Sequence, residues 1–182
     1  MSRRDVVVCH LLSLDGVAEA PEEFFDAWGD EADAAAAEWC TTQDAVVLGR
    51  RSYDEWVRFW PGSDLEPFAS FIGAVEKHVA TSAQLDPPWS NARAIDGDLV
   101  EGIRELRSRP GGEIGVHASI SVAQALLAAG VVDRLRLLVA PTIVGSGRRL
   151  LDGLPPMRLT PMRSEVTPGG CLLLDHRVAL AR

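Results

Sequence analysis

The chain has 182 residues, 47% of them hydrophobic, and a formal net charge of −8 at pH 7. This length and apolar content allow one sizeable core, so we expect a single domain over residues 1–182. The acidic balance argues against binding to nucleic acid, which needs a basic face, and no apolar stretch approaches the ~20 residues that span a membrane.

Short β-branched segments alternate with alanine- and leucine-rich segments along the chain. This pattern is typical of an α/β sheet with crossover helices. In the first half we expect a buried strand at residues 6–12, a helix at 31–40, a strand at 44–48, a helix from 52 that ends before 61, a helix at 66–75 and a strand at 78–81.

The second half continues the alternation and then changes to strands alone. We expect an amphipathic helix at residues 99–107, a strand at 113–117, a helix from Ser119 or Ser121 to 129, a strand at 135–140, and two β segments around 163–167 and 171–176. The segment Pro168-Gly169-Gly170 between the last two is typical of a hairpin turn. Parallel strands should therefore come first and antiparallel strands last.

The segment Leu48-Gly49-Arg50-Arg51-Ser52-Tyr53 joins an expected strand to an expected helix. A strand that turns through glycine into a helix leaves backbone N–H groups facing outward, here with two arginines beside them and a hydroxyl at the expected cap. These features predict an anion-binding turn. The alternative is that the glycine only allows a tight turn, the serine only caps the helix and both arginines are solvated.

An aromatic segment at residues 56–61 contains two tryptophans and a phenylalanine. These side chains either line a ligand cavity, since such cavities are mostly apolar and aromatic, or pack a loop against the core. His10 and His78 lie within apolar strands, and we interpret them as core histidines with satisfied hydrogen bonds rather than as catalysts.

Three cysteines, Cys9, Cys40 and Cys171, are far apart and form no Cys-x-x-Cys pair. This spacing argues against a zinc site and against a disulfide framework, and it suits a reducing cytoplasm. The apolar run near the N-terminus is too short for a signal-peptide core. We therefore expect a cytoplasmic protein without a bound metal.

Five segments, in this order, resemble the dihydrofolate reductase-like superfamily, and most closely the branch of the RibD C-terminal reductase domain of bacterial riboflavin biosynthesis. They lie at residues 13–16, 48–53, 79–82, 130–135 and 141–148. The resemblance implies an α/β three-layer fold in which helices flank a central mixed sheet of about eight strands, with an antiparallel hairpin at the C-terminal end. It also implies that NADPH lies across the carboxyl ends of the parallel strands, where open α/β sheets bind ligands.

The resemblance assigns cofactor contacts to two of these segments. Gly49, Arg50 and Ser52 would meet the phosphates of NADPH at the N-terminus of the second helix. Thr81 and Ser82 would hold the adenosine end, where hydroxyls and an arginine can recognise a 2′-phosphate. This assignment favours NADPH over NADH.

A third contact falls on Ala118 and Ser119, between the strand at 113–117 and the next helix. The family places Gly-Gly or Gly-Ser there, so that the pyrophosphate can approach the backbone. Glycine allows backbone conformations that a Cβ obstructs, and alanine replaces the first glycine in this chain. Two outcomes follow: alanine still fits, because its Cβ is small and the helix N-terminus remains, or it weakens cofactor binding.

Two aspartates are candidates for catalysis. Asp15 belongs to the loop that the family folds over nicotinamide and substrate, and its alternative role is a local turn bond before Gly16. Asp33 falls near the place of the carboxylate that assists protonation in folate-reducing relatives, and its alternative role is to favour the first turn of a helix. The Pro-Trp pair that precedes this acid in dihydrofolate reductases is missing, so folate is not the expected substrate.

Further departures concern the riboflavin branch. The Asn-Pro signature expected soon after residues 48–53 is absent, and so is the neighbouring deaminase domain with its zinc-binding cysteines. These absences disfavour a dedicated riboflavin enzyme. The leading hypothesis is an NADPH-dependent reductase that transfers hydride to a small pterin-like or pyrimidine-like heterocycle, and the alternative is a catalytically inactive relative that binds a nucleotide or another ligand.

Dimerisation is common in this branch, and we expect a homodimer. The apolar run at 135–144 is either fully internal or extends the sheet across a two-fold axis. The following turn brings Arg148 or Arg149 near an anionic substrate group or a second subunit, or is a flexible loop with solvated cations.

Overall fold

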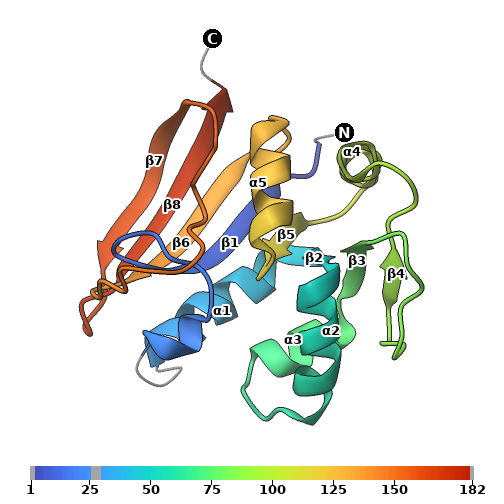
Figure 1. Cartoon of the computed structure of the whole chain (residues 1–182), viewed down its shortest axis with the longest axis horizontal. Helices are drawn as coiled ribbons and strands as arrows, with labels where there is room; N and C mark the ends of the chain where they lie inside the picture. The colour runs from blue at the N-terminus through green and yellow to red at the C-terminus, as the bar shows by residue number, and fades with distance from the viewer. Residues whose placement is uncertain (1–2, 26–29, 181–182) are drawn as a thin grey trace.

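The computed structural model describes residues 3–25 and 30–180, without the side chains of residues 30–33, 36 and 180. Its centre is one eight-stranded sheet with the strand order β4-β3-β2-β5-β1-β6-β8-β7 (Figure 1). The strands are β1 (Val6–Ser13), β2 (Gln43–Gly49), β3 (Glu76–Ala80), β4 (Ala92–Ala94), β5 (Glu113–His117), β6 (Arg134–Ala140), β7 (Met157–Val166) and β8 (Leu172–Leu180).

The first six strands are parallel to one another. Strand β8 pairs antiparallel with β6, and β7 pairs antiparallel with β8 at the edge of the sheet. The helices are α1 (Asp30–Thr42), α2 (Arg50–Phe59), α3 (Phe68–Ala74), α4 (Leu99–Ser108) and α5 (Ile120–Ala128), with short 3-10 helices at Pro21–Glu23 and Trp60–Gly62. This arrangement confirms the expected α/β fold with an antiparallel C-terminal hairpin.

Helices cover both faces of the sheet, which makes three layers. Helices α4 and α5 pack on one face through a core that includes Ile103, Leu126 and Val116. Helices α1 and α3 pack on the other face, where Trp39 contacts residues of β1 and Ile72 contacts residues of β2. None of the helices within the described ranges is long and apolar enough to cross a membrane.

Differences from the expected elements have local causes. Strand β4 has only three residues and β7 is almost entirely exposed, so neither shows the apolar pattern that predicts a strand. Helix α2 begins at Arg50 rather than at Ser52, with Gly49 as its N-cap. Strand β6 lies between β1 and β8, so it is internal and cannot extend the sheet across a two-fold axis.

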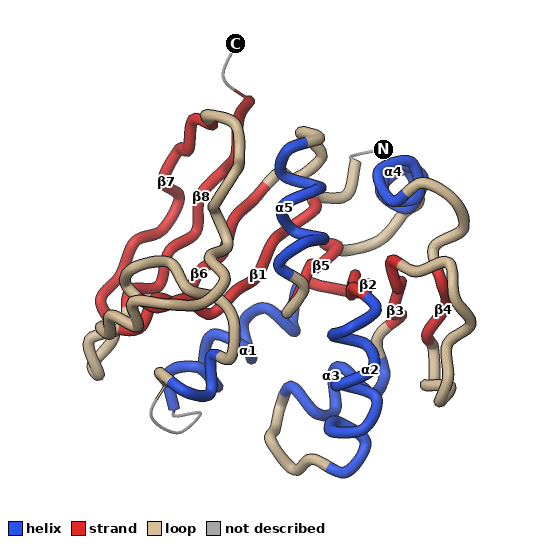
Figure 2. Tube along the Cα trace, viewed as in Figure 1, coloured by secondary structure: helices blue, strands red, loops and turns tan. Residues whose placement is uncertain are grey.

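Two loops far apart in sequence lie side by side near the carboxyl ends of β1 and β6 (Figure 2). The Leu14 N–H donates to the Thr142 carbonyl, and the Ala18 N–H donates to the Arg148 carbonyl. The Leu150 N–H donates to the Gly16 carbonyl. These bonds fix the loop after β1 against the loop after β6.

Candidate functional site

A cleft of about 870 Å³ opens at the carboxyl ends of the central parallel strands. Its walls come from the ends of β1 and β5, the N-termini of α2 and α5, the aromatic face of α2, and the loop at residues 18–22. This is the position at which open α/β sheets bind ligands.

Two helix N-termini face this cleft. The N-cap of α2 is Gly49 and that of α5 is Ser119, and neither helix has a side-chain capping hydrogen bond. The first N–H groups of a helix lack intrahelical partners and favour an anion there. Arg50, Arg51 and Arg148 also line the cleft, so this end of it suits phosphate groups.

Two serine hydroxyls join these helix N-termini. The Gly49 N–H donates to Ser119 Oγ at 2.7 Å, and Ser119 Oγ donates to Ser52 Oγ at 2.9 Å. Ser52 Oγ in turn donates to the Ala118 carbonyl at 3.0 Å. Both serines are buried, so they fix the two helices relative to each other, and Ser52 does not cap α2.

Arg50 connects α2 to the loop after β3. Its Nε donates to both carboxylate oxygens of Asp54 at 2.9 Å, and its Nη1 donates to the Gln84 carbonyl at 2.7 Å. Thr81 and Ser82 lie in this loop but are not among the residues that line the cleft, and Thr81 Oγ1 accepts the Ala83 N–H.

Ala118 has a backbone φ of +50° at the mouth of the cleft. This is the left-handed region, which a residue with a Cβ rarely occupies and which glycine occupies freely. The backbone therefore has the conformation for which the family glycine is suited, although the residue is alanine.

The cleft also includes an aromatic chamber, formed by Trp39, Trp56, Phe59, Trp60 and Phe68. The rings of Trp56 and Trp60 meet edge to face at 5.7 Å, and those of Trp56 and Phe68 at 5.6 Å. Both alternatives from the sequence therefore hold, because the same rings line the cavity and pack against one another. Such walls suit a flat apolar or heteroaromatic ring.

Two histidines lie in the floor of the cleft. Burial lowers the pKa of His10 to about 4 and that of His117 to about 3, so both rings are neutral at pH 7. Nε2 of His10 is buried and has no hydrogen-bond partner within the part of the chain that the structure describes. The structure confirms that His10 is buried in the sheet, but the expected satisfaction of its hydrogen bonds is wrong at Nε2.

The model of the protein family described as RibD C-terminal domain matches residues 4–173. The chain belongs to this family. The uncharacterized protein YyaP of Bacillus subtilis (strain 168) is a relative with 22% identity over 154 residues, which cover 82% of this chain and 81% of YyaP.

Solved structures share the family's dihydrofolate reductase-like fold. A candidate riboflavin biosynthesis protein from Shewanella sp. PV-4 superposes with a TM-score of 0.77 at 19% identity, over 96% of this chain and 99% of that one. The Thermotoga maritima diaminohydroxyphosphoribosylaminopyrimidine deaminase/5-amino-6-(5-phosphoribosylamino)uracil reductase gives a TM-score of 0.67 at 17% identity, over 97% of this chain and 57% of that one.

Asp15, a predicted catalytic residue, is held by four partners. Its carboxylate accepts hydrogen bonds from Ser13 Oγ at 2.7 Å, from the Val144 and Gly145 N–H groups, and from Arg149. The Ser13 hydroxyl, followed by the backbone donors, holds the pKa of this carboxyl far below its usual range. Asp15 is not among the residues that line the cleft, so this geometry supports the alternative, structural role.

The second predicted catalytic residue, Asp33, lies in the first turn of α1, and its side chain is outside the described residues. Its role stays a prediction. The two arginines after β6 take different roles: Arg148 lines the cleft and donates to Ser121 Oγ at 2.8 Å, whereas Arg149 donates to the Asp15 carbonyl at 2.8 Å.

Sequence reasoning missed the residues that connect to His117. Oε1 of Gln43, at the start of β2, lies 2.7 Å from His117 Nε2, and Trp39 packs against the same ring at 6.3 Å between centroids. The signal that could have found them is a buried polar residue at one end of each of two strands with apolar centres, Gln43 in β2 and His117 in β5.

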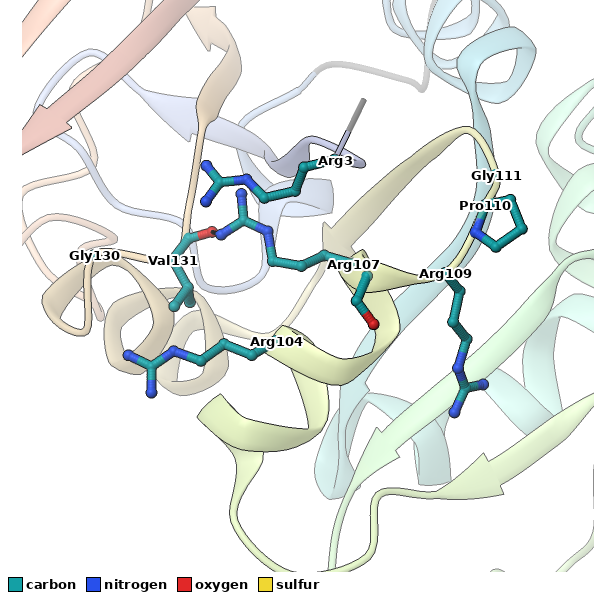
Figure 3. A pocket seen from close by; sticks show the side chains of 9 residues that line it. Arg3, Arg104, Arg107, Arg109, Pro110, Gly111, Gly130 and Val131 are labelled. Carbon is teal, nitrogen blue, oxygen red and sulfur yellow. Dashed lines mark hydrogen bonds between the residues drawn. The ribbon is translucent and has the colours of Figure 1, made fainter. Parts of the chain in front are cut away.

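A second hollow, of about 710 Å³, lies beside the last turn of α4 and is lined by four arginines (Figure 3). Each of them already has a carboxylate partner: Arg3 and Arg107 contact Asp133, Arg104 contacts Glu101, and Arg109 contacts Glu105. Arg107 also donates to the Val131 carbonyl at 3.1 Å. Because each arginine already contacts a carboxylate of the chain, although Arg3 and Arg107 share one, this hollow is not our candidate site.

Proposed function

We propose that this protein is an NADPH-dependent reductase that transfers hydride to a small heterocyclic substrate, pterin-like or pyrimidine-like. The observation that carries the proposal is one cleft lined both by two helix N-termini without side-chain caps and by an aromatic chamber. Membership of a reductase domain family supports the same chemistry. The similarity to the Thermotoga maritima protein, which is named as a uracil reductase among its activities, supports a pyrimidine-like substrate.

The residues present fit a dinucleotide phosphate. The uncapped N–H groups of α2 and α5 would hold the pyrophosphate, with Arg148 beside the N-terminus of α5. Arg50, which reaches the loop after β3, would meet the 2′-phosphate together with Thr81 and Ser82. Arg50 already contacts Asp54, so binding would exchange part of that ion pair for the phosphate.

Bound NADPH supplies the hydride, and the chain supplies orientation and a site that excludes water. The aromatic chamber would hold the flat substrate ring against the nicotinamide. His10 and His117 are poor proton donors at pH 7 because burial keeps their pKa values near 4 and 3. The proton that completes the reduction would therefore come from water or from Asp33.

A second function is favoured by Ala118. Its Cβ stands where the family has glycine, at a φ of +50°, and this methyl group would crowd a pyrophosphate. If this crowding prevents productive binding, the protein is an inactive relative that binds a nucleotide or another ligand in the same cleft.

The proposal includes a cytoplasmic homodimer. Cys9 and Cys40 carry free thiols, in keeping with a reducing compartment. Strand β7 is the outer edge of the sheet and exposes apolar side chains, with Met162 50% and Val166 72% accessible to solvent. These apolar side chains could contact a second copy, whereas Pro161 and the charged residues Arg158 and Arg163 of the same strand oppose direct edge-to-edge pairing.

Titration with NADPH and, separately, with NADH tests the proposal, with quenching of tryptophan fluorescence as the readout. Trp39, Trp56 and Trp60 line the cleft, so a bound dinucleotide should quench them. We expect saturable binding with a preference for NADPH that is reduced in Arg50→Ala. Oxidation of NADPH with a panel of pterins and aminopyrimidines then separates the two functions, since an inactive relative would bind without turnover. No saturable binding of either dinucleotide would contradict the reductase.

A further inference from the structure

A chain of three buried polar side chains runs from the sheet to the floor of the cleft. Cys9 on β1 and His117 on β5 are register partners, and Gln43 on β2 reaches both. The amide Nε2 of Gln43 donates to Cys9 Sγ at 3.3 Å, and its Oε1 lies 2.7 Å from His117 Nε2. All three residues are buried.

This chain fixes the tautomer of His117. Gln43 is placed with its amide nitrogen toward the Cys9 sulfur and its amide oxygen toward the imidazole. An amide oxygen can only accept, and His117 Nε2 must therefore carry the proton. In a neutral imidazole the other nitrogen is then an acceptor, so Nδ1 of His117 presents a lone pair.

The fold makes room for this pair with a glycine. A Cβ at Gly115 would lie 2.0 Å from Gln43 Oε1 and 2.7 Å from His117 Nε2, so every other residue type would collide with both groups. Gly115 has no positive φ, and it is therefore not required for backbone conformation. It is required for the Gln43–His117 contact.

Aromatic rings surround His117 on the side of the cleft. The ring centroids of Phe68, Trp39 and Trp56 lie 5.7, 6.3 and 6.4 Å from that of the imidazole. Within the described residues no hydrogen bond reaches Nδ1, although His117 lines the cleft. An acceptor of fixed tautomer at the floor of an aromatic chamber is a recognition group that the protein itself leaves unused.

We propose that His117 determines the specificity of the aromatic chamber by accepting, at Nδ1, a hydrogen bond from an N–H or O–H group on the edge of a planar ring. The inference rests on the proposed function, because it concerns the substrate end of the same cleft. Gln43 is a positioning residue, since it acts through the tautomer of His117. A ring that presents a carbonyl or carboxylate oxygen at this point would meet a lone pair and be rejected.

Two small probes of nearly the same shape test this directly. 2-Aminopyrimidine carries N–H donors, and 2-methylpyrimidine has a methyl group in their place. We expect wild-type protein to bind the amino compound about fivefold more tightly, the value of one net hydrogen bond, in a fluorescence titration. We expect His117→Phe, which keeps a ring, to lose this preference and Gln43→Leu to reduce it.

His78→Phe is the matched control, because His78 is also a buried histidine of the sheet but does not line the cleft. This variant should keep the preference. A spectroscopic readout uses the ¹⁵N resonance of His117 Nδ1 in wild-type protein: 2-aminopyrimidine should shift it and 2-methylpyrimidine should not. This second readout holds even if a variant fails to fold.

Equal affinity for the two probes, no binding of 2-aminopyrimidine, or an unchanged preference in His117→Phe would overturn the inference. NADPH titration of the same preparations separates it from the proposed function. A probe preference lost in His117→Phe with no NADPH binding in wild type would contradict the reductase and leave the recognition group in place. NADPH binding without any probe preference would contradict the inference about His117 and leave the proposed reductase function in place.

Discussion

The two hollows of this protein differ in how their polar groups are paired. In the hollow beside α4, each of the four arginines contacts a carboxylate of the chain, and Nε of Arg107 is the buried atom there that has no hydrogen-bond partner among the described residues. In the cleft at the carboxyl ends of the strands, two helix N-termini lack side-chain caps. Among the described residues, none reaches the buried Nε2 of His10 or Nδ1 of His117 with a hydrogen bond.

This difference distinguishes residues that stabilise the fold from residues that are available to bind a ligand. A buried polar group without a partner costs stability, so a fold retains it only where something else compensates. Charge alone would have selected the arginine hollow. The two helix N-termini without side-chain caps select the cleft instead, and the following variants test that choice.

The largest effect should follow from Asp133→Ala in the arginine hollow. Asp133 contacts Arg107, whose side chain is 6% exposed, and it also accepts the Val6 N–H. Removing one partner of a buried ion pair leaves an uncompensated charge, so the free energy of unfolding should fall by about 3–5 kcal/mol in urea titrations. Glu105→Ala, which removes an exposed partner of Arg109, is the control and should cost less than about 0.5 kcal/mol. Equal losses of unfolding free energy in the two variants would show that the Asp133–Arg107 pair stabilises the fold no more than an exposed ion pair does.

A second effect is the pH dependence that the cleft histidines impose. The pKa of His10 is lowered from 6.5 to about 4 by burial, so the unfolded chain binds this proton first as the pH falls. Stability should therefore decrease between pH 6.5 and pH 4, with about 3 kcal/mol from His10 by pH 4.

Urea unfolding of wild type and His10→Leu at pH 7 and pH 4.5 measures this contribution. The variant should lose less stability on acidification than wild type does. Parallel losses in both proteins would mean that His10 is not held neutral in the folded state.

A smaller effect should come from Ala118→Gly. Glycine removes the strain of a φ of +50°, and we expect the free energy of unfolding to rise by about 1 kcal/mol. Ala125→Gly in the exposed face of α5 is the matched control, because glycine inside a helix should lower stability by about 1 kcal/mol. The test fails if both substitutions shift the melting temperature in the same direction.

The smallest effect should be that of Arg104→Ala. Its ion pair with Glu101 is between exposed side chains, so the free energy of unfolding should change by less than about 0.5 kcal/mol. NADPH affinity should not change, whereas Arg148→Ala in the cleft should weaken it. A loss of NADPH binding in Arg104→Ala would indicate that the cofactor binds in the arginine hollow and not in the cleft.

The sequence predicted most of the parallel strands because each has an apolar centre bounded by polar or turn residues. The strand at residues 113–117 has the expected bounds, and that at 6–12 differs by one residue. Strand β7 extends to Met157, well before the expected start, because an exposed edge strand has no buried face to impose a period.

The sequence predicted where the site lies in the fold but not which side chains contact one another there. The glycine turn at 48–53 correctly marked the helix N-terminus that borders the cleft. The role of Asp15 depends on Val144 and Gly145, about 130 residues away, and the tautomer of His117 depends on Gln43, 74 residues away. No local pattern encodes such partners, since they meet only when the sheet and loops have assembled.

The most direct test of the central claim is to follow backbone amide resonances of ¹⁵N-labelled protein during titration with NADPH. If the cleft is the ligand site, the largest shifts should fall on Gly49, Ala118 and Ser119, at the N-termini of α2 and α5. Arg104 and Gly130, which line the arginine hollow, should not respond. Shifts confined to the arginine hollow, or none at all, would contradict the assignment of the cleft as the site of this protein's function.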